Sequence, residues 1–395
     1  MKKTIFAVAL TAALGLSAAQ AETVLYGSLR FGMNYAKNHN NYEIVGNQWV
    51  QGEEKKGADL VDTGSRIGIK GGEDLGNGFK AIFLAEFAFD GMEGHLGNNG
   101  GGFSNRLAYI GLQSDTVGTF AVGRQDNPFH STVVFATADT FNEVSVFAGA
   151  LATSFVLTGG IIDTNGNGDT DARGLASRVG NAVAYVSPTW SGFSFNTALI
   201  IDAPNGEPAN LGDANTSVDA FTVNAQYKSD FGLTAAIGYL DAQRVGDRTA
   251  GPMSTDAKVY SANVGFENDM FSAGVGYTDG KSTSDMMGLD FPLDVKANGW
   301  DIGGQFKFNQ EMTSVRALVG KAKGKFATNV AGFTNETNIT NWAIGLEHKL
   351  SQRTRVWAEY ENQKTTYTLR VNGGINQRPE SDKTNRFNMG VRHDF

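Results

Sequence analysis

Cysteine is absent from the 395-residue chain, proline occurs 7 times and histidine 5 times. Without cysteine there is neither a thiol nucleophile nor a disulfide framework, so stability has to come from size or architecture. The histidines show no metal-ligand spacing, and neither G-x-S-x-G nor H-E-x-x-H is present. These absences argue against a hydrolase or a zinc enzyme.

Long apolar runs are also missing after residue 21, where none approaches the roughly 18–20 residues of a membrane helix. Residues 1–21 read as a cleaved signal peptide: "MKK", an apolar stretch over 4–18, and the A-x-A site at 19–21. The chain is therefore predicted to be exported. Cleavage removes Lys2 and Lys3, leaving 31 basic and 41 acidic residues, a net charge of −10. An acidic chain argues against a nucleic-acid partner.

What the chain has is glycine, 50 residues, and a repeated alternation of apolar and polar side chains. "AFTVNAQYK" places Phe221 and Val223 on one face and Thr222 and Asn224 on the other, which is typical of a strand. Sixteen segments follow this pattern: 23–35, 64–73, 79–90, 103–113, 118–126, 178–187, 190–202, 217–228, 232–243, 256–267, 270–282, 295–308, 312–324, 337–350, 353–367 and 384–395.

The connections between these segments alternate in length. Tight polar turns such as "DLGNG" and "SDFG" alternate with long links: 36–63, 91–102, 127–177, 203–216, 244–255, 283–294, 325–336 and 368–383. Short turns on one side and long loops on the other are typical of an outer-membrane barrel. A barrel in lipid has to close, so the last strand should pair with the first and place Phe395 at the membrane boundary.

The faces of the strands support the same interpretation. Charged residues such as Arg30, Asp301 and Glu359 fall on the polar faces, too many for a packed interior. Aromatic residues lie near strand ends on the apolar faces, in positions suited to interfacial girdles: Tyr35, Tyr227, Trp342 and Tyr360. The sequence predicts an all-β fold, a sixteen-stranded antiparallel transmembrane barrel over 22–395, with its apolar side to lipid and its polar side to a wet lumen.

Several stretches resemble general diffusion porins of Gram-negative outer membranes. They are "NRLAYIGLQSDTVGTFAVGRQDNPF" (105–129), "SRVGNAVAYVSPTWSGFSF" (177–195), "VWAEY" (356–360) and the terminal Phe395. The resemblance implies a homotrimer whose third external loop, here 127–177, folds inward as the constriction. Small residues beside aromatics in 103–113 could pack against a neighbouring copy.

The resemblance also implies a set of pore residues. Asp139 and Glu143 match the acids of such a loop, although "FNEV" stands where the family often has Pro-Glu-Phe-Gly. The arginines of the facing wall match Arg66, Arg106 and Arg178. Three further residues are added to this set on other grounds. Arg124 is a plausible further arginine of the wall, and Glu86 falls on the polar face of its strand. Arg30 lies near a first-strand position that often holds lysine in the family. Opposed acids and bases would set a field across the opening. Each arginine could equally be a lumen residue that is paired locally.

A second motif lies inside the long loop. "DTNGNGDTD" begins like a calcium loop, with alternating oxygen ligands Asp163, Asn165, Asn167, Asp169 and Asp171. The closing glutamate is missing, because Gly174 occupies its position. A structural Ca²⁺ and a plain polar turn both fit this composition.

We expect a passive, water-filled channel for ions and small hydrophilic solutes in the bacterial outer membrane, in contact with lipid and lipopolysaccharide. The acidic chain predicts a mild cation preference, which the lumen arginines oppose. An adhesin or receptor barrel is the alternative, and an enzyme barrel is a more distant one because no catalytic constellation is present.

Overall fold

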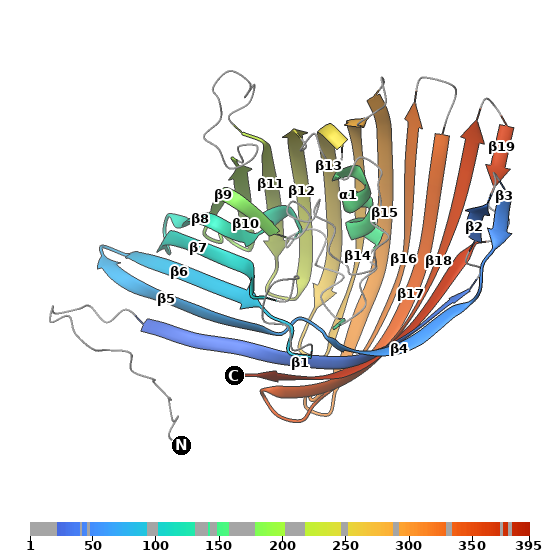
Figure 1. The fold of residues 1–395 in the computed structure, drawn as a ribbon. Helices are drawn as coiled ribbons and strands as arrows, with labels where there is room; N and C mark the ends of the chain where they lie inside the picture. Colours follow the sequence, from blue (N-terminus) through green and yellow to red (C-terminus); the bar gives the residue numbers. More distant parts are fainter. Residues whose placement is uncertain are drawn as a thin grey trace.

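The computed structural model describes residues 22–39, 42–45, 48–92, 102–130, 141–142, 148–157, 178–201, 218–245, 252–286, 292–328, 334–371, 374–377 and 381–395. These residues form a closed antiparallel β-barrel (Figure 1). Its strands are β1 (Glu22–His39), β4 (Lys55–Asp62), β5 (Arg66–Gly76), β6 (Phe79–Ala88), β7 (Ser104–Ser114), β8 (Gly118–Asp126), β9 (Arg178–Val186), β10 (Phe193–Ile200), β11 (Ala220–Lys228), β12 (Leu233–Val245), β13 (Pro252–Glu267), β14 (Phe271–Met286), β15 (Pro292–Phe308), β16 (Thr313–Thr328), β17 (Thr334–Lys349), β18 (Thr354–Val371) and β20 (Asp382–Asp394).

The wall contains sixteen strands, as predicted. Both β4 and β5 pair with β1, so they are two halves of one wall strand that is interrupted at residues 63–65. The short β19 (Gly374–Gln377) pairs with the outer end of β18. A separate hairpin joins β2 (Tyr42–Val45) to β3 (Gln48–Gln51). The barrel closes where β1 pairs with β20 over twelve positions, from Ser28 with Asp394 to His39 with Lys383.

The terminal aromatic residue lies at this closure. The backbone N–H of Phe395 donates to the carbonyl of Gly27 at 3.0 Å, and the N–H of Gly27 donates back at 3.1 Å. The ring of Phe395 occupies the space that a Cβ at residue 27 would need, so glycine is required there. The last residue is thus bonded to the first strand.

Replacing Phe395 with alanine should lower the yield of refolded barrel. The ring is partly exposed, and its loss removes about 1 kcal/mol of contact at the closure while leaving the backbone bonds in place. The yield can be measured as the heat-modifiable band on a gel after refolding into detergent. Phe395→Trp should restore the yield, because tryptophan also suits the membrane interface. Equal yields for all three proteins would contradict a role for the terminal ring.

The outward face of the barrel carries an apolar belt. Val264, Val275, Ile302, Val319 and Ile344 are each at least 40% exposed, and they occupy neighbouring positions across β13–β17. The rings of Trp342 and Tyr360 pack 5.4 Å apart beside this belt, at predicted girdle positions. Exposed apolar side chains in such number fit contact with lipid.

Two sequence-based expectations need correction. Several strands extend beyond the predicted segments: β14 reaches Met286, and β4 lies within the predicted 36–63 link. The residues at these outer ends are mostly polar, so the apolar alternation did not predict them. The inner face is also not polar throughout, because Val259, Val295 and Ala297 point inward and are at most 2% exposed. They pack against helix α1 (Ala148–Leu157), which the sequence did not predict.

Helix α1 lies within the curve of the wall formed by β13–β16 (Figure 1). No helix among the described residues is long and apolar enough to cross a membrane.

Candidate functional site

A buried carboxylate organises the arginines of the N-terminal wall. Glu86 on β6 is 5% exposed and accepts a hydrogen bond from Arg106 Nε at 2.7 Å and one from the Tyr26 hydroxyl at 3.0 Å. The Nη1 of Arg66 lies 3.7 Å from the same carboxylate. A paired buried acid of this kind fixes the direction of both guanidinium groups.

Irregularities in three strands lie beside these arginines. In β7 the register passes from Glu86 with Leu107 to Phe87 with Asn105, which makes Arg106 the extra residue of a bulge. Between β8 and β9 the register also shifts at Arg124, where Asn181 adopts a positive φ of 47°. Bulges bend the strand and redirect side chains, so the wall is shaped locally to present these groups.

The third irregularity is the break between β4 and β5. The Asp62 Oδ1 accepts the backbone N–H groups of Gly64 and Ser65 at 2.8 and 2.6 Å, which forms a compact turn directly before Arg66. Short aspartate-centred turns of this type satisfy backbone donors that have left the sheet ladder.

Two arginines continue this wall across β8 and β9. Arg178 Nε lies 3.8 Å from the carboxylate of Asp126, its cross-strand neighbour. Arg124 Nε donates to the backbone carbonyl of Asn105 at 3.1 Å.

Burial and the nearby Arg178 charge lower the pKa of His130 to about 4, so this histidine is neutral at physiological pH.

On the other side of Arg66 the arginines continue across the barrel closure. Arg30 on β1 is directly opposite Arg392 on β20, which is in turn opposite Arg355 on β18. Like charges that face each other across strands destabilise a sheet. The carboxylate of Asp394 moderates this, because it lies 2.7 Å from Arg392 Nε and 3.3 Å from Arg355 Nη2.

The next strands hold a buried cluster of charges. Arg316 on β16 is 4% exposed and lies 3.0 Å from Glu347 on β17 and 3.7 Å from Glu359 on β18. Asn142 covers this cluster: its backbone N–H donates to Glu359 at 2.7 Å and its amide donates to Glu347 at 2.9 Å. The ring of Phe141 lies 5.9 Å from the Arg316 guanidinium carbon. One point of the long loop is therefore bound to the inner wall.

Helix α1 is held a short distance along the same wall. Its first two N–H groups, from Ala148 and Gly149, donate to the two oxygens of Asp301 at 2.8 Å each. A carboxylate at a helix N-terminus pairs the free donors and interacts favourably with the helix dipole. At the other end, the Ser282 hydroxyl donates to the carbonyl of Val156 at 2.7 Å.

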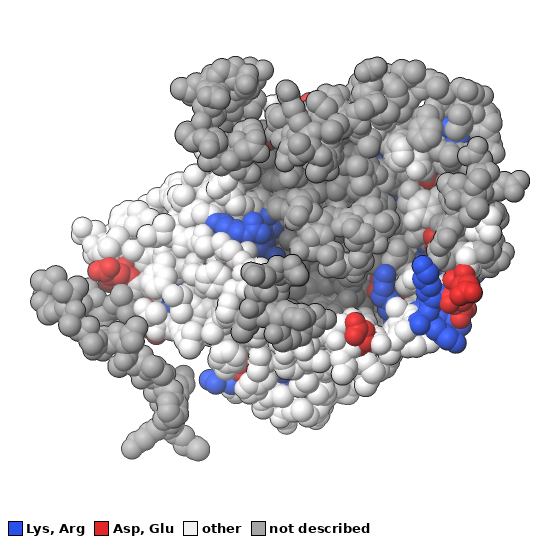
Figure 2. Space-filling view, viewed as in Figure 1, with Lys and Arg blue, Asp and Glu red and all other residues white. Residues whose placement is uncertain are grey.

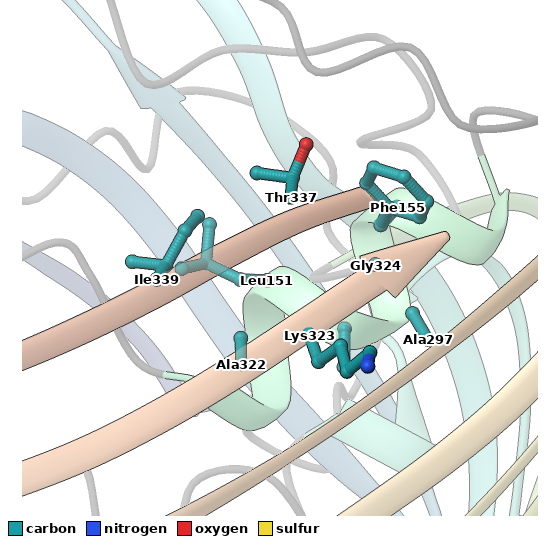
Figure 3. A pocket seen from close by; sticks show the side chains of 9 residues that line it. Leu151, Phe155, Ala297, Ala322, Lys323, Gly324, Thr337 and Ile339 are labelled. Carbon is teal, nitrogen blue, oxygen red and sulfur yellow. The ribbon is translucent and has the colours of Figure 1, made fainter. Parts of the chain in front are cut away.

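Apolar contacts complete the attachment of α1. Leu151 and Phe155 lie against β16 and β17, where they line a small hollow with Ala322 and Ile339 (Figure 3). Gly324 leaves room for the Phe155 ring, which a Cβ would meet. This hollow lies between the helix and the wall, and it is separate from the arginines.

The comparisons with known proteins agree with this architecture. A family profile described as Gram-negative porin matches residues 7–368. The chain belongs to the Gram-negative porin family.

The porin is 26% identical to an outer membrane porin protein of Bordetella pertussis over a 426-residue alignment that covers 100% of both chains. It is 36% identical over 134 residues to the major outer membrane protein P.IB of Neisseria meningitidis, covering 33% of this chain and 36% of that protein. Its fold is similar to that of an anion-selective porin from Comamonas acidovorans, with a TM-score of 0.65, 20% identity and coverage of 95% and 100% of the two chains.

A trimer form of OmpT from Vibrio cholerae is similar in fold, with a TM-score of 0.59, 16% identity and coverage of 95% and 99%. Family and relatives identify this porin as a non-enzymatic channel for passive diffusion in the bacterial outer membrane.

The predicted site residues of the porin are only partly brought together by the described structure. Five arginines and one acid of the predicted set lie among the described residues with the contacts given above, and their role at a constriction stays a prediction: Arg30, Arg66, Arg106, Arg124, Arg178 and Glu86. Asp139, Glu143 and the calcium candidates Asp163, Asn165, Asn167, Asp169 and Asp171 lie outside the described residues, so they stay predictions.

Sequence reasoning missed Arg316, Arg355 and Arg392. Each falls on the polar face of its strand, and this position in the alternation could have indicated that the side chain faces the lumen. Their position beside the predicted arginines depends on how β16–β20 register against β1, which the sequence does not reveal. We call the eight arginines together the arginine belt: Arg30, Arg66, Arg106, Arg124, Arg178, Arg316, Arg355 and Arg392.

Proposed function

We propose that the porin is a diffusion channel narrowed by residues 127–177, and that its opening beside the arginine belt prefers anions. The single observation that carries the proposal is the imbalance of the belt. Among the described residues, the eight arginines of the belt have five carboxylates within 4.0 Å: Glu86, Asp126, Glu347, Glu359 and Asp394. Two further acids of the inner wall are engaged elsewhere, because Asp301 caps α1 and Glu361 pairs with Arg386. The loop attachments at Asn142 and α1 support the narrowing.

The exposed fractions of these side chains add to the excess of positive over negative charge. Glu86, Glu347 and Glu359 are each less than 10% exposed, and Asn142 binds the last two. Five belt arginines have side chains that are 19–27% exposed: Arg66, Arg106, Arg178, Arg355 and Arg392. Of their acids, Asp126 and Asp394 are accessible, at 63% and 28%. Figure 2 shows one group of Lys and Arg side chains over the β8–β10 side of the barrel and a second one, with acidic side chains beside it, over the β4 side. A solute that passes the belt would meet more unscreened positive than negative charge.

The proposed anion preference is opposite to the cation preference that the net charge predicts. Net charge is summed over the whole surface, whereas charges beyond about 8 Å are largely screened at physiological salt. Selectivity therefore depends on charges beside the solute path. Two unit charges 6 Å apart interact by about 0.7 kcal/mol even in bulk water, which is about threefold in an equilibrium constant.

Swelling of porin-containing liposomes tests the proposal. Three solutes of similar size are compared: glucose, gluconate and glucosamine. All three should enter, with gluconate about threefold or more faster than glucosamine for one uncompensated charge near the path. No swelling with any solute would overturn the open channel. Equal rates for gluconate and glucosamine would overturn the anion preference alone.

We also propose that residues 1–21 are removed on export and that the porin self-associates as a trimer. The A-x-A site supports the first and the trimer form of OmpT the second. Sedimentation in detergent, corrected for bound detergent, should give three times the monomer mass. A monomer mass with retained conductance would contradict the trimer.

A further inference from the structure

Asp394, the last residue of β20, bridges two arginines of the inner wall. Its Oδ1 lies 2.7 Å from Arg392 Nε, and its Oδ2 lies 3.3 Å from Arg355 Nη2. The side chain is on the inner face, because Met389 and Val391, which have the opposite phase on the same strand, are exposed on the outer face. One carboxylate thus occupies two guanidinium groups with one oxygen each. A sulfate or carboxylate group of a solute could bind the same pair in this way.

Two further arginines lie close to this bridge. Arg30 is directly opposite Arg392 across the barrel closure, and Ser28, which is opposite Asp394, is also opposite Arg66. The Ser28 hydroxyl accepts a hydrogen bond from Arg30 Nε at 2.6 Å, which directs that guanidinium along the inner face. Neighbouring strands are about 4.8 Å apart, so the backbone positions of all four arginines lie within about 10 Å of Asp394.

The other carboxylates that pair with these four arginines are less accessible than Asp394. The side chain of Glu86, which pairs with Arg66, is 7% exposed. The side chain of Glu347, which lies 3.8 Å from Arg355, is 9% exposed. The side chain of Asp394 is 28% exposed. Within the described part of the chain, Asp394 is therefore the acid of this group that shares the most surface with the lumen.

We propose that Asp394 is a specificity-determining residue that keeps small dianions from being retained in the channel. Its carboxylate occupies the Arg355–Arg392 pair as a built-in anion, so a passing sulfate or dicarboxylate finds no free bridging pair there. A channel conducts an ion only where binding is weak enough for release. The inference rests on the proposed anion preference and adds to it the residue that limits anion binding at the closure of the barrel.

Asp394→Asn should turn the arginine pair into a binding site for small dianions. Asparagine keeps the shape of the side chain but replaces one acceptor oxygen with an NH₂ donor, so one of the two arginines loses its acceptor. The net positive charge beside the solute path rises by one. One unit charge at about 6 Å in water changes binding about threefold for a monovalent anion and about tenfold for a dianion.

Block of the single-channel chloride current by sulfate tests the inference. The recordings use about 0.1 M KCl, where the Debye length of about 10 Å leaves the nearby charges effective. The sulfate concentration that halves the current should be about tenfold lower in Asp394→Asn than in the wild type. Asp394→Ser is a second neutral variant with the same expected shift, so the test does not depend on the refolding of one protein.

Three further variants separate charge from structure. Asp394→Glu keeps the acid and should need nearly the wild-type sulfate concentration. Asp394→Asn combined with Arg392→Gln removes one acid and one base, and it should return the half-blocking concentration to within about twofold of the wild type. The matched control is Asp230→Asn, an exposed acid in the short turn between β11 and β12, which should change the value by less than about twofold. The heat-modifiable band on a gel shows that each protein has folded.

Equal sulfate sensitivity of the wild type and the neutral variants would overturn the inference. A double variant as sensitive as Asp394→Asn alone would overturn it as well, because the exposed arginine pair would then not be the cause. The proposed anion preference has a separate readout, the reversal potential of the wild type, so failure of that proposal is distinguishable from failure of this one.

Discussion

The triple variant Arg66→Gln, Arg106→Gln, Glu86→Gln should lose most of the anion preference of the porin. Both arginines reach the lumen side of the wall, and Glu86 is the buried acid between them. Replacing Glu86 as well avoids leaving a buried carboxylate without its partners, which would cost about 3–5 kcal/mol. The glutamine at position 86 can still accept from the Tyr26 hydroxyl. The chloride-to-potassium permeability ratio should fall about threefold or more.

Two further variants make this prediction specific. Glu86→Gln alone removes one negative charge and should raise the same ratio slightly. Arg353→Gln with Lys228→Gln removes two positive charges beside the short turns, where screening should keep the change small. A triple variant with the wild-type ratio would show that the arginine belt does not control selectivity.

Glu359→Ala should release the long loop from the wall. The Glu359 carboxylate is 1% exposed, accepts the backbone N–H of Asn142 at 2.7 Å and lies 3.7 Å from Arg316. Its removal takes away the acceptor of the Asn142 N–H and leaves Arg316 with Glu347, 3.0 Å away, as its remaining acid. We expect this loss to appear as loop release, because the barrel itself is held by ladder hydrogen bonds on every strand.

Limited proteolysis and single-channel recording measure the release. Cleavage within 127–177 should become at least tenfold faster, and the open-channel current should become larger and noisier. Glu359→Gln should behave between wild type and alanine, because the amide oxygen can still accept from Asn142. The matched control is Glu336→Ala, an outward acid on β17 that pairs with Lys323. Wild-type cleavage and current in Glu359→Ala would contradict the anchoring role.

Asp301→Ala should loosen the same segment at its second attachment. It removes the acceptor of the first two N–H groups of α1, and the loss of a helix cap costs about 1–2 kcal/mol. The effect on proteolysis should therefore be smaller than that of Glu359→Ala. Combining both substitutions should exceed either alone, since the two attachments lie at different points of the loop.

The strands and the barrel could be predicted from the sequence because a lipid-facing surface imposes a strict two-residue alternation. The alternation is absent where a segment does not present an apolar face to lipid. In β4, exposed polar residues such as Lys55 and Lys56 continue the wall beside β1 without an apolar face. Helix α1 has apolar residues all around, and it forms because its contacts with the inner wall stabilise it.

The site was predictable to the extent that each side chain could be assigned to a face. Arg66, Arg106 and Glu86 could be named from the sequence, yet the bulge at Arg106 cannot be recognised in the alternation of apolar and polar residues. Arg392 joins the belt because β20 pairs with β1, a contact between the two ends of the chain. Register and closure are set by the whole sheet, so they could not be read from single segments.

The reversal potential of the wild-type porin in a planar lipid bilayer tests the central claim most directly. A tenfold KCl gradient is suitable, because potassium and chloride have nearly equal mobilities in water. The arginine belt predicts a reversal potential with the sign of the chloride equilibrium potential. The chloride-to-potassium permeability ratio should be about three or more. A reversal potential of zero, or one with the sign of the potassium equilibrium potential, would contradict an anion-selective opening.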